Sequence, residues 1–90
     1  MYELEYTNIF KKNYKRIQKR SYDIELLIAL FEQLAMHGNV SAAYKPHKLF
    51  ENYAGYWECH IKPDWLLIWK VNEHKQCVVL HFTGTHSDLF

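Results

Sequence analysis

Apolar and polar residues alternate at the start of the chain and then change to a helical period. The stretch "YELEYT" alternates and contains aromatics, which predicts a strand over residues 2–6. A helix is predicted to follow from Asn8 to about Arg20, with Thr7 as its N-cap. Its apolar residues fall on one side of the helix: Ile9, Phe10, Tyr14 and Ile17.

A second amphipathic helix is predicted directly after the first. Its apolar residues recur with the i, i+3, i+4, i+7 spacing: Ile24, Leu27, Ile28, Phe31, Leu34 and Ala35. Ser21 or Asp23 can cap its start, and Gly38 with Asn39 ends it. The two helices therefore form a hairpin with its turn near Ser21.

The second half of the chain has the pattern of a sheet. Residues 40–54 have no clear period and predict a loop with room for a short turn of helix, whereas strands are predicted over about 55–61, 65–71 and 76–82. The connections between these strands are so short that neighbours must be antiparallel. The order β-α-α-β-β-β predicts one α+β domain over residues 1–90, with a helical hairpin packed on an antiparallel sheet.

Charge is distributed unevenly along a chain whose formal net charge is only +1. The segment "KKNYKRIQKR", residues 11–20, holds six of the eleven basic residues and no acid. Five of them share the polar side of the first predicted helix: Lys11, Lys12, Lys15, Arg16 and Lys19. This side is either a solvated helix face or a surface that binds phosphates.

The location of the protein is indicated by what the sequence lacks. No apolar run is long enough to cross a membrane, and the first residues lack the pattern of a signal peptide. We therefore expect a cytoplasmic protein that makes no membrane contact. In that compartment Cys59 and Cys77, which lie in predicted strands, are expected to be reduced core residues.

Histidines and acids cluster in turns and at strand ends of the second half. Period 2 places Tyr56, Glu58 and His60 on one side of the first sheet strand, away from the apolar set Trp57, Cys59 and Ile61. The other candidates lie outside the strands: His47 in the loop, Asp64 in the turn after the first sheet strand, and His86 in the turn and short tail that follow the last strand. Imidazoles and carboxylates supply the acid and base needed for proton transfer near neutral pH.

Simpler interpretations of these residues stay open. Asp64 follows Pro63 in a tight turn and can serve only to order it, and the role of His81 is open. No H-x-H, H-x-x-x-H or C-x-x-C spacing is present, so neither a metal nor another cofactor is expected.

Two motifs connect the chain to a known family. The segment "HKLFENYAGYWECHIKPDWLLIWKV" and the closing "TGTHSDLF" resemble the YafQ branch of the RelE/ParE toxin superfamily. The resemblance implies the RelE-like fold and the toxin of a type II toxin–antitoxin pair, a metal-independent endoribonuclease that cuts mRNA in the ribosome. Carried over by motif, His47, His60, Asp64 and His86 are catalytic candidates, with Glu58 as a further one.

The same resemblance implies how the protein is bound and controlled. Trp65 and Phe90 would help to hold the RNA. If the basic helix side is a phosphate-binding surface and not only a solvated face, its charge would attract it to rRNA. A DinJ-like antitoxin, encoded next to the toxin, would be the cognate partner, and operator DNA would be contacted only through the antitoxin complex. The ribosome and mRNA complete the expected partners.

Two residues depart from the family pattern. The family usually has arginine at the positions of Trp57 and Phe82, and the second arginine is the natural partner of phosphate charge. An alternative therefore stays open: a non-nuclease, ParE-like toxin, or a catalytically weakened one that acts by binding.

Overall fold

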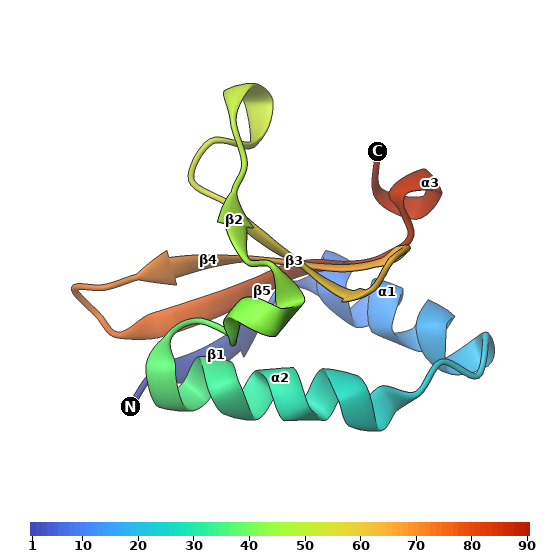
Figure 1. Ribbon diagram of the computed structural model, residues 1–90, viewed down its shortest axis with the longest axis horizontal. Helices are drawn as coiled ribbons and strands as arrows, with labels where there is room; N and C mark the ends of the chain where they lie inside the picture. Colours follow the sequence, from blue (N-terminus) through green and yellow to red (C-terminus); the bar gives the residue numbers. More distant parts are fainter.

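The computed structural model describes all residues, 1–90, and contains a five-stranded sheet and two long helices (Figure 1). Its elements are β1 (Glu3–Tyr6), α1 (Asn8–Lys19), α2 (Ile24–His37), the 3₁₀ turn η1 (Ala42–Tyr44), β2 (His47–Lys48), the 3₁₀ turn η2 (Glu51–Tyr53), β3 (Trp57–Lys62), β4 (Trp65–Asn72), β5 (Cys77–Gly84) and α3 (His86–Leu89). The predicted strand–helix–helix–strands order is confirmed. None of the helices has the length and apolar character of a membrane-spanning segment.

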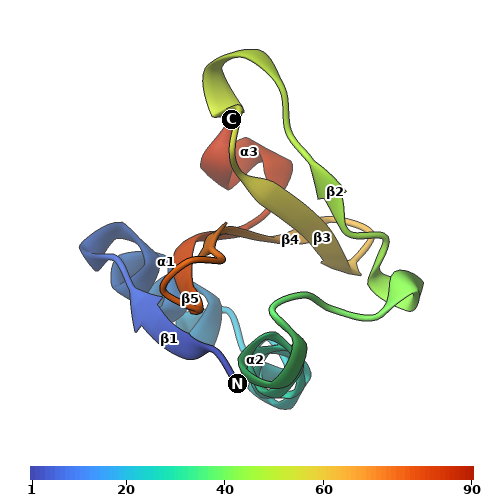
Figure 2. The same cartoon turned by 90° about the vertical axis from the view of Figure 1, so that its left-hand side faces the viewer.

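The sheet has the strand order β1-β5-β4-β3-β2. β3, β4 and β5 pair antiparallel, as the short connections predict, and β2 pairs antiparallel with β3. β1 lies parallel to β5, because the helical hairpin returns the chain across the sheet. Both long helices lie on one face, and α3 with the β2–η2 segment stands on the other (Figures 1 and 2). We call this second face the helix-free face.

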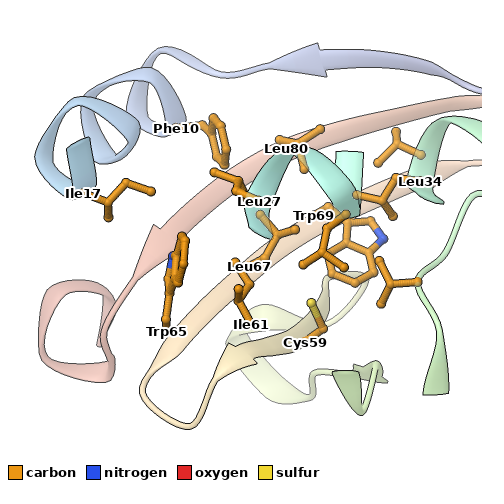
Figure 3. Packing of buried hydrophobic residues seen from close by; sticks show 13 residues of the cluster. Phe10, Ile17, Leu27, Leu34, Cys59, Ile61, Trp65, Leu67, Trp69 and Leu80 are labelled. Atoms are coloured by element: carbon orange, nitrogen blue, oxygen red, sulfur yellow. The ribbon is translucent and has the colours of Figure 1, made fainter. Parts of the chain in front are cut away.

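The core fills the space between the helices and the sheet (Figure 3). Cys59 and Ile61 of β3 are buried in it and Trp57 packs against it, so the predicted inward side of β3 is confirmed. Both cysteines are free and buried, as predicted. Burial raises the pKa of the Cys59 thiol to about 12, which makes it an inert core residue.

The helix boundaries follow from local chemistry. Thr7 accepts a hydrogen bond from the Phe10 amide and caps α1, and Asp23 is the cap of α2. Gly38 ends α2 with φ +72°, and a Cβ at this position would lie 2.5 Å from the Tyr2 ring. The predicted apolar sides need correction at Ile9 and Ile28, which are 54% and 39% exposed because the core reaches only part of each helix.

Two short elements differ from the sequence prediction. Residues 40–54 are not only a loop with turns: His47 and Lys48 form β2, which pairs with Glu58 and Trp57 of β3. The chain end is not a simple tail, because α3 begins after a capping box made by Thr85 and Asp88. Both elements carry a histidine onto the helix-free face.

Candidate active site on the helix-free face

Five predicted residues from four segments meet at one end of the helix-free face: His47 (β2), Glu58 and His60 (β3), Asp64 (the β3–β4 turn) and His86 (α3). Their floor is formed by Leu66 and Ile68 of β4, which are fully buried and lie opposite His60 and Glu58. An apolar floor under polar side chains fixes their positions without competing for their hydrogen bonds.

Glu58 is the buried centre of the first pair. Its side chain is only 8% exposed, and its Oε1 lies 3.1 Å from His47 Nε2 and 4.0 Å from His60 Nε2. His47 Nδ1 lies 3.0 Å from the Lys45 carbonyl, which only accepts hydrogen bonds, so Nδ1 carries a proton. The second ring nitrogen, Nε2, is therefore the one that faces the Glu58 carboxylate, so Glu58 and the Lys45 carbonyl together fix the plane of the His47 ring.

Asp64 and His86 form the second pair. Asp64 Oδ1 lies 3.2 Å from His86 Nδ1 and also accepts the His86 backbone amide at 3.2 Å. These hydrogen bonds lower the pKa of the Asp64 carboxyl. Asp64 therefore does more than order its own turn: as a carboxylate it orients the His86 ring and leaves Nε2 free.

The three imidazole rings lie in a row. Ring centroids are 6.1 Å apart between His47 and His60, and 6.4 Å apart between His60 and His86. The second gap separates two histidines that each have a carboxylate oxygen within 4.0 Å of a ring nitrogen, so a group bound between them would have on either side an imidazole able to take or give a proton. No set of three or more His, Cys, Asp or Glu side chains is arranged to hold a metal ion.

An aromatic layer that the sequence prediction did not include continues this row. His86 lies 6.2 Å from Phe90, Phe90 lies 5.1 Å from Tyr53, and Tyr53 lies 6.1 Å from Tyr56, all measured between ring centroids. Phe90 is 54% exposed, so one end of the layer is open to a ligand. Period 2 places Tyr56 on the side of Glu58 and His60, but the sequence does not show that Tyr56 meets Tyr53 there.

An irregularity in β5 explains His81. Phe82 lies opposite Ile68 but Leu80 lies opposite Trp69, so His81 is an extra residue in the ladder. As a result His81 and Phe82 both reach the Tyr56 ring, at 4.9 and 6.1 Å. Burial, and then the charge of Lys70, lowers the pKa of His81, which favours a neutral ring that packs in this layer.

The chain end that carries His86 and Phe90 is tied to α1. Arg20 binds both carboxylate oxygens of Asp88, at 2.6 and 3.0 Å, and Arg16 lies 3.6 Å from the same group. The Thr85 amide donates to Asp88 as well. The sequence prediction missed Arg20 and Asp88, which lie far apart in the sequence.

We expect Asp88→Asn to lower activity without unfolding the domain. The asparagine loses the ion pair with Arg20, so His86 and Phe90 are no longer held in place, and a misplacement of about 1 Å can cost about 10²-fold in rate. Hydrogen–deuterium exchange should show faster exchange only in α3. Glu32→Gln removes an exposed carboxylate from α2 and is the matched control.

Acid should have the same effect as this substitution. The Arg20 guanidinium and the Thr85 amide lower the pKa of Asp88 in the folded protein, so its contribution is fully present above the unfolded pKa of about 4 and is lost as the pH falls through the lower folded value. Exchange in α3 should therefore rise below about pH 4. Unchanged α3 exchange in both the variant and acid would contradict this role of Asp88.

Comparison with known proteins now identifies the chain. The family model "Bacterial toxin of type II toxin-antitoxin system, YafQ" matches residues 2–90. The chain belongs to the YafQ toxin family. It is 37% identical over 91 residues to the mRNA interferase toxin YafQ of Escherichia coli (strain B / BL21-DE3), covering 98% of this chain and 95% of that protein.

Solved structures of similar proteins agree with the fold. YafQ in the E. coli DinJ–YafQ complex is 35% identical, with a TM-score of 0.85 over 100% of this chain and 99% of that one. The metal-bound toxin from Helicobacter pylori is 32% identical, with a TM-score of 0.90 over the whole of both chains. The RelE-like fold inferred from the sequence motifs is therefore confirmed.

Within the YafQ pattern, one predicted RNA-binding residue has to be corrected. Trp65 is 3% exposed, its Nε1 donates to Thr83 Oγ1 at 2.9 Å, and its ring packs edge-on against Tyr22. Figure 3 shows it inside the core. Trp65 therefore has no free ring face for a base, and Phe90 is the aromatic of the pattern that remains available.

The structure also shows where the basic side of α1 lies and which face of the sheet carries Trp57 and Phe82. Lys11, Lys12, Lys15, Arg16 and Lys19 are all exposed on α1. Trp57 stacks on Trp69 on the core side of β3, with centroids 6.4 Å apart, so it does not face the site. Of the two positions where the family usually has arginine, only Phe82 lies on the helix-free face.

Proposed function

We propose that this protein is the toxin of a type II toxin–antitoxin pair and that it cleaves mRNA on the ribosome through the RNA 2′-OH. The observation that carries the proposal is the pair of histidines His60 and His86, with ring centroids 6.4 Å apart and a carboxylate oxygen 4.0 and 3.2 Å from a ring nitrogen of each. One removes the 2′-OH proton and the other protonates the departing 5′ oxygen, so the reaction needs no metal from the protein. The name of the E. coli relative, mRNA interferase toxin, supports the same reaction.

The other residues have supporting roles in this proposal. Glu58 holds His47 and lies beside His60, and Asp64 orients His86. Phe90 stacks on a base next to the cut, because its ring is exposed beside His86. The basic side of α1 is attracted to rRNA phosphates. The reaction takes place in the cytoplasm, where ribosomes and mRNA are found.

A test follows from the position of the cut. The protein is expressed in bacteria from an inducible promoter, and mRNA 5′ ends are mapped by primer extension, with His86→Ala as the control. New 5′ ends at codon boundaries that are absent in the control are expected. Purified protein with programmed ribosomes should cut equally well with and without EDTA; loss of cleavage that zinc restores would contradict a metal-independent reaction.

The alternative is a toxin that acts only by binding. It is favoured by Phe82, which offers no charge to a phosphate on the helix-free face. Growth arrest with intact mRNA and damaged DNA would support a ParE-like action instead. Growth arrest with neither change would support a weakened toxin that only occupies its target.

We also propose that a DinJ-like antitoxin, encoded beside the toxin, holds it inactive. The DinJ–YafQ complex supports this partner. An acidic antitoxin segment would match the five basic residues of α1, and operator DNA would be reached only through the complex. Co-expression of the neighbouring gene should abolish growth arrest, and its protein product should co-purify with the toxin. A toxin gene that is cloned freely and recovered alone would contradict the pair.

A further inference from the structure

A groove adjoins the acid–base set at His60. It has a volume of about 450 Å³ and is lined by Ala43, Lys45, His60, Ile61, Lys62 and Pro63. In Figure 2 the η1 turn (green) and α3 (red) lie on either side of β3. The groove therefore extends from His60 toward η1, whereas the His86–Phe90 end of the site extends toward α3.

The groove is positively charged. Two of its six lining residues are lysines, none is a carboxylate, and both lysines are exposed. Neither ammonium group forms an ion pair with an acidic side chain of the protein. The positive charge of the groove is thus available to an anionic ligand.

Backbone geometry connects both lysines to the site. Lys45 ends η1 in the left-handed region, with φ 52°, and its carbonyl binds His47 Nδ1 at 3.0 Å. Lys62 lies at the register shift that separates it from His60 in the β3–β4 pair. Each lysine is therefore placed by the same segment that places a histidine, and not by a flexible surface loop.

We infer that this groove binds the phosphate of the nucleotide next to the cleaved linkage, with Lys45 and Lys62 as its ligands. The inference rests on the proposed function. A chain of RNA whose cleaved phosphate lies between His60 and His86 continues past His60 into the groove, while a base on the other side reaches Phe90. The lysines supply positive charge near a site in which Phe82 supplies none.

The experiment compares the double variant Lys45→Gln/Lys62→Gln with the parent in single-turnover cleavage of mRNA on programmed ribosomes. The double variant should raise the half-saturating toxin concentration about tenfold and leave the maximal rate within about twofold. The salt dependence should weaken by about 0.7 in log–log slope for each lost contact. Lys75→Gln, in the exposed β4–β5 turn, removes the same charge and should change neither quantity.

A chemical change in the RNA separates this role from a general loss of ribosome binding. Each linkage that flanks the cut is replaced in turn by an uncharged methylphosphonate. At one of the two linkages, the replacement should raise the half-saturating concentration of the parent about as much as the double substitution does on normal mRNA. The same replacement should not raise the half-saturating concentration of the double variant any further.

The outcomes distinguish the groove from the proposed function itself. If the parent does not cleave at all, the proposed function fails. If the parent cleaves and the folded double variant has the same half-saturating concentration, the groove does not bind a neighbouring phosphate. The same conclusion follows if the effects of the double substitution and of the methylphosphonate add at both linkages. Circular dichroism and a thermal melt establish that the variants are folded.

Discussion

Replacing His86 by alanine is expected to lower the rate of mRNA cleavage by about 10²–10⁴-fold, the usual contribution of a general acid or base. The side chain of His86 is 57% exposed and makes its polar contact with Asp64, so its loss removes no core packing. Growth arrest should be relieved while the thermal melt is unchanged. His74→Ala, in the exposed β4–β5 turn, is the matched control and should cleave like the parent.

The same variants can assign the acid and the base. A substrate whose 5′ leaving oxygen is replaced by sulfur departs without protonation, so it restores the rate of a variant that lacks the general acid. We take His86 as the general acid because the Asp64 carboxylate lies 3.2 Å from its Nδ1 and leaves Nε2 free, so we expect His86→Ala to be rescued and His60→Ala not to be. A folded His86→Ala protein that cuts the normal substrate at the parental rate would show that His86 takes no part.

Asp64→Ala should lower the single-turnover cleavage rate, but by less than His86→Ala does. The Asp64 carboxylate accepts a hydrogen bond from the His86 backbone amide and lies 3.2 Å from Nδ1 of the His86 ring. Its removal therefore changes the orientation of an otherwise intact histidine. The histidine itself remains, which is why a smaller loss than for His86→Ala is expected.

Local signals in the sequence were enough to predict most of the fold. The caps Thr7 and Asp23, the stop at Gly38 and the apolar runs of β4 and β5 each act within a few residues, so the pattern contains them. β2 could not be predicted, because a strand of two residues has no period and exists only through its pairing with β3. The parallel pairing of β1 with β5 is likewise a property of the tertiary structure.

The candidate site was predictable where strand parity applies and less so elsewhere. Period 2 placed Glu58 and His60 on the helix-free face, but it did not show that Glu58 is buried under His47. The tie between Arg20 and Asp88 spans 68 residues, and no local pattern encodes it. Trp65 was misassigned because its place in the motif, beside Asp64, does not reveal that its side chain turns into the core.

The position of Phe82 was also beyond the sequence, because it depends on the extra residue His81 in β5. Without that irregularity Phe82 would lie on the other face of the sheet, since side chains alternate along a strand. With it, Phe82 lies above Ile68 and beside Tyr56, half-buried. An arginine at this position would therefore face the site and not the core.

Phe82→Arg is accordingly expected to speed single-turnover cleavage. Attack by the 2′-OH builds negative charge on the phosphate oxygens, and a preorganised donor at such a position is commonly worth about 10²–10³-fold in rate. Position 82 lies opposite Ile68, whose other cross-strand neighbour is Glu58, so a guanidinium there would extend over the same face as the acid–base residues. The gain should therefore approach the lower end of that range.

Two controls separate charge from shape in this prediction. Phe82→Gln places a polar side chain without charge at the same position and should not be faster than the parent, whereas Phe82→Lys should give part of the gain because a lysine offers only a point charge. A melt that falls sharply for Phe82→Arg would mean that the charge is buried without a partner. A folded Phe82→Arg protein that cuts no faster would show that another group already meets the phosphate charge, and would remove the reason to regard Phe82 as a weakness of the site.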